Sequence, residues 1–101
     1  MPVQLEIDRR AISDFCERHH ICRLALFGSV LRDDFDPSSD VDVLVEFEPA
    51  HVPGLIRFGA IERELGRLFG GRRADLVTFK GLNRHIREGV LANAEPIYAR
   101  R

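Results

Sequence analysis

The sequence lacks several features that would place the protein in a specialised class. Its two cysteines, Cys16 and Cys22, have no CxxC spacing, and the amino terminus has no signal-peptide core, which argues against a disulfide framework or a zinc–cysteine site. No apolar run approaches the roughly 18 residues of a membrane span. A formal net charge of -1 argues against a strongly basic nucleic-acid binder or a membrane-surface protein. These absences predict a cytoplasmic protein.

The histidines also lack a recognised metal-binding pattern. His19 and His20 are adjacent, without an HExxH motif, and two histidines at the end of a helix usually cap its carbonyl groups or face solvent. His51 lies in a proline-bounded loop, and no partner for it is evident from the sequence. We therefore expect that His19 and His20 do not bind a metal ion, and we assign no role to His51.

Length and composition indicate a single domain that spans residues 1–101. The chain is 45% hydrophobic and 31% charged, which is ordinary for a globular protein of this size. This length leaves no room for a second domain that would hold an acceptor substrate. Recognition of an acceptor is therefore expected to need a partner.

Hydrophobic periodicity predicts the element order α-β-β-α-β-α, and Asp8 has the character of an N-cap for the first helix. The predicted ranges are 8–18 (helix), 21–28 and 41–47 (strands), 54–69 (helix), 72–79 (strand) and 82–91 (helix), followed by a short tail. This order predicts an α+β fold, an α/β sandwich in which helices pack on one face of a small mixed sheet. The order of the strands in the sheet is left open.

An unusual group of acidic residues surrounds the second predicted strand. Six acidic residues lie between Asp33 and Glu46, and Asp40 and Asp42 flank the first valine of a strand that alternates apolar and polar positions. Residues two apart in a strand share a face, about 6.5 Å from each other, so these two carboxylates are expected to project side by side. Unpaired carboxylates in such a place are costly, and Mg²⁺ is the cation that suits oxygen ligands. Asp75 would add a third carboxylate if its strand neighbours the second one.

A glycine turn precedes this acidic stretch. Gly28 and Ser29 follow an apolar strand, so that backbone N–H groups can turn toward an anion, and Arg32 lies one turn further along. A glycine at the end of a strand is usually only a turn, so this feature alone is a weak indication of phosphate binding.

The combined pattern is more specific than its parts. The stretches "GSVLRDDFDPSSDVDVLVEF" and "ADLV" resemble the minimal nucleotidyltransferases of the DNA polymerase β-like superfamily, which often serve as antitoxin partners of HEPN-domain toxins. The resemblance extends from about Leu24 to Tyr98. It departs from many relatives at Arg32-Asp33, where they have Arg-Gly.

The resemblance implies a role for each matching residue. Gly28, Ser29 and Arg32 would hold the phosphates of ATP. Asp40, Asp42 and Asp75 would form the catalytic metal site, with two Mg²⁺ ions that steady the attacking and leaving oxygens.

Three functions follow from this resemblance. The first is transfer of AMP from ATP to a hydroxyl of a partner protein, a HEPN-type toxin that is thereby neutralised in an assembly of the two. The second is a non-catalytic antitoxin of the same fold, and the third is nucleotidyl transfer to a small molecule or an RNA end. The full set of carboxylates favours the first, because a pure binding module has no physical need for them.

Overall fold

The structure is a computed structural model that describes residues 5–31, 36, 39–82 and 84–100. Its helices and strands follow in the order α1 (Arg9–Arg18), β1 (Ile21–Phe27), β2 (Val41–Phe47), α2 (Leu55–Leu68), β3 (Ala74–Thr78), α3 (Arg84–Asn93) and β4 (Glu95–Ala99). Three short 3-10 turns are η1 (Gly28–Leu31), η2 (Pro49–His51) and η3 (Phe79–Gly81). The α+β class and the order of the six predicted elements are confirmed, and β4 is an addition. Within the described part of the chain, no helix is long and apolar enough to cross a membrane.

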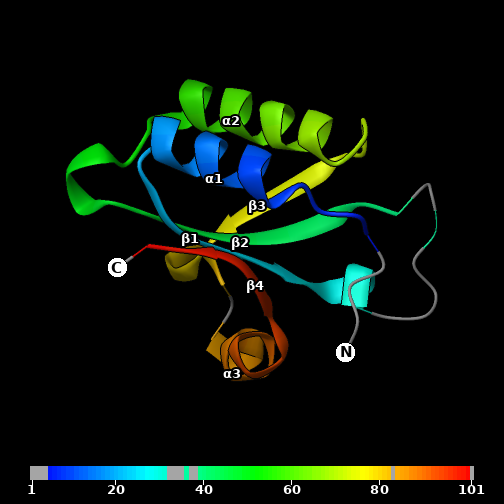
Figure 1. Cartoon of the computed structure of the whole chain (residues 1–101). Helices are drawn as coiled ribbons and strands as arrows, with labels where there is room; N and C mark the ends of the chain where they lie inside the picture. Colours follow the sequence, from blue (N-terminus) through cyan, green and yellow to red (C-terminus); the bar gives the residue numbers. More distant parts are fainter. Residues whose placement is uncertain (1–4, 32–35, 37–38, 83, 101) are drawn as a thin grey trace.

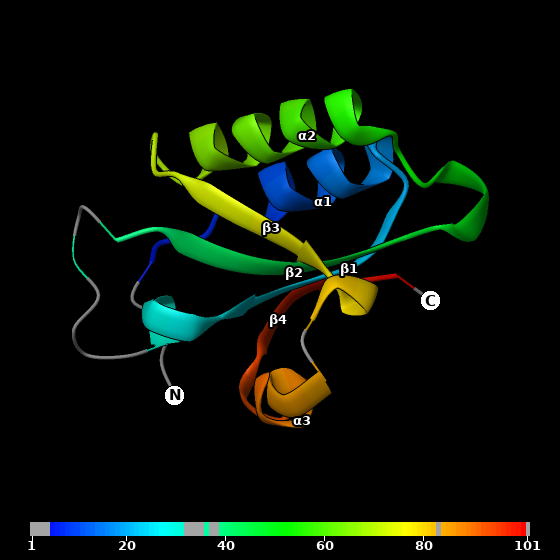
Figure 2. The same cartoon turned by 180° about the vertical axis from the view of Figure 1, so that it is seen from behind.

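The four strands form one mixed sheet in the order β3-β2-β1-β4 (Figure 1). Strand β1 is antiparallel to both of its neighbours, whereas β2 and β3 are parallel. Helices α1 and α2 lie together on one side of the sheet, and α3 lies on the other side next to β4, as Figures 1 and 2 show. The expectation of helices on one face therefore holds for α1 and α2 but not for α3.

Helix α1 forms where its cap and apolar spacing predict it. The Asp8 carboxylate accepts a hydrogen bond from the backbone N–H of Ala11 at 3.1 Å, which confirms the predicted N-cap. Ile12, Phe15 and Cys16 then recur at helical spacing and are buried against the sheet. The first helix is thus fixed by its N-terminal hydrogen bond and by its apolar face.

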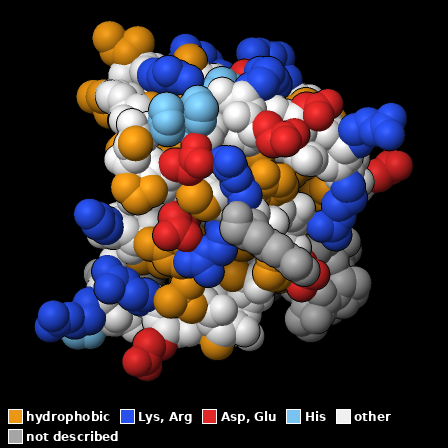
Figure 3. Space-filling model, turned by 60° about the vertical axis from the view of Figure 1, so that its left-hand side comes forward, with side chains coloured by type: hydrophobic (Ala, Val, Ile, Leu, Met, Phe, Trp, Pro, Cys, Tyr) orange, Lys and Arg blue, Asp and Glu red, His pale blue; other side chains and the backbone are white. Residues whose placement is uncertain are grey.

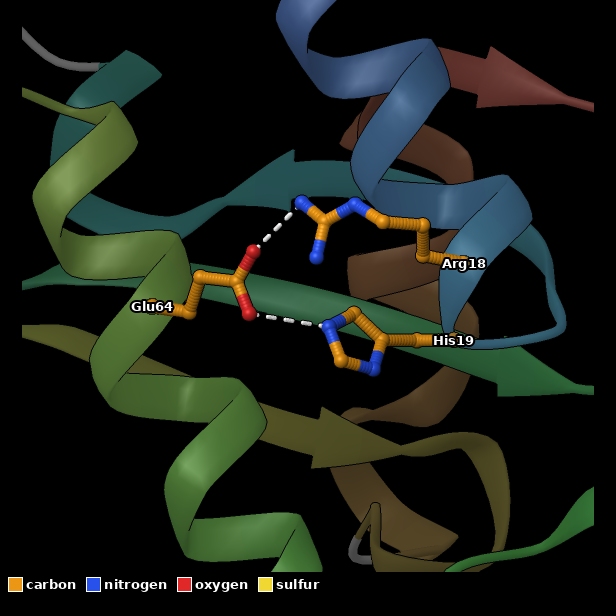
Figure 4. Close-up of polar contacts among 3 residues, drawn as sticks. All are labelled: Arg18, His19 and Glu64. Carbon is orange, nitrogen blue, oxygen red and sulfur yellow. Dashed lines mark hydrogen bonds and ion pairs between the residues drawn. The ribbon is translucent and has the colours of Figure 1, made fainter.

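Helix α2 packs beside α1, and one carboxylate joins the two. Glu64 of α2 accepts hydrogen bonds from Arg18 at 2.5 Å and from His19 at 2.9 Å (Figure 4). The Arg18 hydrogen bond, followed by that of His19, holds the pKa of Glu64 below its usual value, although partial burial opposes this shift. His19 is thus a helix-pairing residue rather than a solvent-facing one.

Strand β2 forms the centre of the core. Val41, Val43 and Val45 are fully buried and belong to the hydrophobic cluster that also contains the buried residues of α1 and α2. Each buried valine contributes about 1.5–3 kcal/mol relative to an exposed one, so the strand's register is strongly specified. The alternation therefore directs Asp42 to the opposite face of the sheet.

The predicted tail is the edge strand β4. Leu24 of β1 pairs with Tyr98, while Ile97 is buried and Tyr98 packs against the core. Pro96 explains why the sequence did not predict a strand, since proline cannot donate a ladder hydrogen bond and is confined to edge strands. Strand β4 is such an edge strand, so the proline is tolerated.

Candidate active site

The register of the sheet brings two of the predicted carboxylates together. Asp42 of β2 is paired with Asp75 of β3 in the parallel ladder. Paired residues of neighbouring strands lie about 4.8 Å apart across the ladder and point to the same face. Strand β3 therefore neighbours β2. This is the arrangement that Asp75 needs in order to lie beside the other two aspartates. Asp42 is half-buried and Asp75 is exposed, so the pair opens to solvent on one side.

Asp40 lies at the start of the same strand. It directly precedes Val41, the first residue of β2, and its side chain is exposed. The backbone N–H of Val41 donates a hydrogen bond to the carbonyl of Arg73 at 2.9 Å, which fixes this entry to the strand beside β3. All three predicted carboxylates thus lie where β2 and β3 begin.

The glycine turn lies directly against Asp42. Gly28 follows Phe27, which pairs with Asp42 across the β1–β2 ladder. Its φ is +76°, a region that favours glycine, and a Cβ atom placed there would overlap the Asp42 carboxylate. Glycine is therefore required at this position both by its backbone conformation and by the close approach of Asp42.

The 3-10 turn η1 begins at this glycine. Val30 and Leu31 are buried in the core and anchor the turn. The backbone of Ser29 lies within η1, and its role in phosphate binding stays a prediction. Arg32, the third predicted phosphate ligand, lies outside the described residues.

Hydrogen bonds also hold the approach to Asp40. The backbone N–H of Ser39 donates to the carbonyl of Asp36 at 3.0 Å, and the N–H of Asp36 donates to the Ser39 hydroxyl at 3.1 Å. Arg72, just before β3, donates to the Asp36 carbonyl at 2.9 Å. Arg72 thus holds Asp36 in place ahead of Asp40, a role that the sequence did not indicate.

Glu62 is a second positioning residue that the sequence did not indicate. Its carboxylate, on α2, accepts a hydrogen bond from the backbone N–H of Leu76 at 2.7 Å. Because β3 is the edge of the sheet, this N–H has no neighbouring strand on its outer side. Glu62 therefore holds the edge strand next to Asp75. On the sequence it is one of several charges along a helix, so no signal distinguishes it.

The donor chemistry of the site fits a hard divalent cation. Carboxylate oxygens are the ligands that Mg²⁺ prefers, and it completes its coordination with water and substrate phosphates. A glycine turn with a short helical segment beside the carboxylates is a suitable place for those phosphates. Such a combination suits phosphoryl or nucleotidyl transfer.

Comparison with known proteins identifies the family. The family model for the nucleotidyltransferase domain matches residues 8–96. The chain belongs to this nucleotidyltransferase family. The matched range contains both the glycine turn and the three aspartates, so the enzyme carries the candidate site within its family domain.

Individual relatives of this nucleotidyltransferase agree with that assignment. The protein adenylyltransferase MntA of Thermococcus cleftensis is 39% identical over 75 residues, which are 74% of this chain and 73% of that protein. A solved minimal nucleotidyltransferase is 38% identical, with a TM-score of 0.70 and coverage of 87% of both chains. A toxin–antitoxin crystal structure with AMP-PNP is 16% identical, with a TM-score of 0.72 over 94% of this chain and 76% of that one. The last likeness shows the fold alone.

Proposed function

We propose that this nucleotidyltransferase moves AMP from ATP to a hydroxyl of a partner protein in a Mg²⁺-dependent reaction. The observation that carries the proposal is the pairing of Asp42 with Asp75, with Gly28 against the Asp42 carboxylate. The 39% identity to a protein adenylyltransferase supports AMP as the transferred group. ATP as the substrate is supported by the fold neighbour solved with AMP-PNP.

The proposed reaction gives each part of the site a role. Asp40, Asp42 and Asp75 would hold two Mg²⁺ ions, which when bound stabilise the charge on the attacking and leaving oxygens. The acceptor oxygen forms a bond to the α-phosphorus, and the bond from that phosphorus to the bridging oxygen breaks, so that pyrophosphate leaves with the electron pair.

The protein's own contribution is mainly position. The backbone of the Gly28 turn holds the triphosphate beside Asp42, and exposed Asp75 faces the solvent from which an acceptor hydroxyl approaches. The acceptor's hydroxyl proton passes to solvent or to a neighbouring carboxylate as the new bond forms.

The proposed partner is a toxin of the HEPN type, which modification with AMP would neutralise within a complex of the two proteins. The toxin–antitoxin assembly among the fold neighbours supports this choice of partner. A non-catalytic antitoxin is less favoured, because binding alone requires neither the paired aspartates nor the glycine beside them. A single-domain organisation and a cytoplasmic location stay predictions from the sequence.

The test is a transfer assay with every acceptor present. The protein is incubated with ATP labelled on the α-phosphate, Mg²⁺, the product of the adjacent gene and total RNA. Mass spectrometry then measures the mass of each protein, and the label is followed in every other component. We expect the partner protein to gain the mass of AMP in the parent reaction, and to gain none with EDTA or with Asp42→Asn. A partner that binds tightly but gains no mass would support the non-catalytic antitoxin. Label on RNA or on a small molecule would instead support the third function.

A further inference from the structure

A second cluster of ligand-type side chains lies at the opposite end of the β1–β2 pair. It consists of His20 from the α1–β1 turn, Glu48 just after β2 and His51 from η2, and one ligand atom from each lies within 4.8 Å of the other two. Figure 3 shows histidine side chains on the molecular surface with an acidic side chain beside them. The His20 side chain is 40% exposed and His51 is exposed, so the cluster is accessible to an ion from solvent.

Main-chain hydrogen bonds hold these three residues together. The N–H of Glu48 donates to the carbonyl of His20 at 2.9 Å, and the N–H of His51 donates to the carbonyl of Glu48 at 2.8 Å. The side chains add a contact of 3.0 Å between His20 Nδ1 and Glu48 Oε2. Arg100 holds the other carboxylate oxygen of Glu48 at 2.7 Å. The fold thus sets the backbone positions of the three residues, and hydrogen bonds hold the side chains of His20 and Glu48.

His20 occupies a left-handed backbone position that few residues other than glycine adopt. It follows α1 with a φ of +57° and, among the described residues, is the sole non-glycine residue with a positive φ. Glycine is the usual residue at the left-handed end of a helix, because a Cβ atom there is strained. Residues held in such conformations concentrate at functional sites. This conformation places the His20 imidazole beside the Glu48 carboxylate.

We propose that His20, Glu48 and His51 form a binding site for a divalent transition-metal ion of the Zn²⁺ class. Two imidazoles and one carboxylate are ligands that Zn²⁺ takes from proteins, with bonds of about 2.0–2.1 Å, so that ligand atoms lie about 3.3 Å apart around a tetrahedral ion. The 3.0 Å contact between His20 and Glu48 is already close to that spacing. A fourth coordination position is left for water or for a side chain of a bound partner.

The imidazole rings define the movement that binding requires. The rings of His20 and His51 are stacked, with centroids 3.7 Å apart and an interplanar angle of 9°. Stacked rings cannot both direct a nitrogen lone pair at one ion, because each ligated ion lies in the plane of its ring. His51 is exposed, so its ring is free to turn out of the stack toward the ion. Metal binding therefore replaces a ring stack with a coordinated pair.

This site is separate from the aspartate site in position and in chemistry. Glu48 follows Asp42 by six residues along β2, a separation of about 20 Å in an extended strand. Imidazole ligands select borderline ions such as Zn²⁺, Co²⁺ and Ni²⁺, whereas carboxylates and phosphates select Mg²⁺. The inference goes beyond the proposed transfer reaction and does not depend on it.

The test uses Co²⁺, whose visible absorption changes when protein ligands replace water in a site of low coordination number. The purified protein is titrated with Co²⁺ in millimolar Mg²⁺, which occupies the aspartate site, and Zn²⁺ is then added in competition. We expect one Co²⁺ per chain, displaced by Zn²⁺, and binding at least about tenfold weaker in His51→Ala and His20→Asn, as follows from loss of a metal ligand. Asparagine suits the second position because it tolerates a positive φ.

Two matched variants complete the design. His85→Ala removes an exposed histidine of α3 outside the cluster and should leave Co²⁺ binding unchanged. Asp42→Asn should also leave it unchanged. The proposal is overturned if the parent binds no Co²⁺, if His51→Ala binds it as the parent does, or if Asp42→Asn abolishes the signal. His51 is exposed, so its alanine variant is expected to fold even if His20→Asn does not.

Discussion

The two ends of the β1–β2 pair differ in the ligands they present and in how those ligands are held. At one end, Asp42 and Asp75 lie side by side on adjacent strands, and a glycine turn approaches the first of them. At the other end, main-chain hydrogen bonds join His20, Glu48 and His51, which offer two imidazoles and a carboxylate. The buried valines of β2 separate the ends and make the strand a rigid spacer. One antiparallel pair can thus carry an oxygen-ligand site and an imidazole site that are independent of each other.

The largest effect on the transfer rate is expected from a substitution in the aspartate site alone. Asp42→Asn keeps the side chain's shape and removes one charge, so we expect transfer at least about a hundredfold slower, the scale for loss of one key electrostatic group. Without metal the variant should be at least as stable as the parent, since neighbouring carboxylates repel. Transfer rates and melting curves with and without Mg-ATP measure both effects. A near-parental transfer rate would remove Asp42 from the metal site.

The reverse substitution tests the independence of the two ends. His51→Ala should lower Co²⁺ affinity at least about tenfold while it leaves the transfer rate at the parental value, because His51 lies far from the aspartates. The same two assays, applied to both variants, give the comparison. If His51→Ala slowed transfer as much as Asp42→Asn does, the two ends would not be independent.

Gly28→Ala tests the close approach of the turn to Asp42. The new Cβ atom would overlap the carboxylate and would also strain a backbone with φ of +76°, so we expect transfer to fall at least about tenfold and stability to fall by about 1–3 kcal/mol. Gly70→Ala is the matched control, since Gly70 has a φ of +79° and open space around its Cβ position. It should lose stability without loss of transfer. Equal transfer losses in the two variants would show that strain alone matters.

The sequence predicted which strands carry the aspartates, but it did not indicate that His20 and His51 meet. Strict alternation gave β2 its observed bounds, Val41–Phe47, because one face of the strand is buried in the core. The pairing of Asp42 with Asp75 depended on strand order, which local periodicity does not contain. His20 and His51 are distant in sequence and meet only because β1 and β2 are antiparallel. No spacing motif could therefore have revealed them.

The apolar spacing of α2 does not by itself show how much of the helix is covered. Leu55 shares the spacing of the buried apolar residues, yet it is 90% exposed, because it is the first residue of α2 and lies beyond the helix's contact with the sheet. Ile61 and Leu65, further along the same stripe, are buried as periodicity predicts. Periodicity identifies the apolar face of a helix. The tertiary structure decides how much of that face packs against the rest of the protein.

Glu64→Gln alters the contact between α1 and α2, which belongs to neither end of the β1–β2 pair. The Arg18 hydrogen bond lowers the pKa of Glu64, so its contribution is present above the unfolded-state pKa of about 4.5 and is lost as pH falls through the lower folded-state pKa. Because the pair is partly exposed, we expect a loss of at most about 1 kcal/mol at neutral pH. Urea unfolding of both proteins from pH 7 to pH 3 should show the difference shrink below pH 4.5. A constant difference would exclude the ion pair as its cause.

The smallest functional effect is expected from the cysteines. Burial, with a smaller contribution from Glu17, raises the pKa of Cys16 to about 12, so its thiol stays protonated and should react slowly with iodoacetamide until the protein unfolds. Half-buried Cys22 should react faster. Serine at either position should leave transfer unchanged and lower stability by at most about 1 kcal/mol. A serine variant that folds but does not transfer AMP would show that this cysteine contributes to the active site.

The location of the metal–nucleotide complex is the most direct test of the account. Mn²⁺ prefers carboxylate and phosphate ligands, as Mg²⁺ does, and its unpaired electrons broaden the NMR signals of nearby amides. Spectra of the ¹⁵N-labelled protein would be recorded with ATP and substoichiometric Mn²⁺. We expect the amide signals of Gly28, Asp42 and Asp75 to broaden first, while those of Glu48 and His51 stay sharp. Broadening centred on Glu48 and His51, with the aspartate signals unchanged, would contradict it.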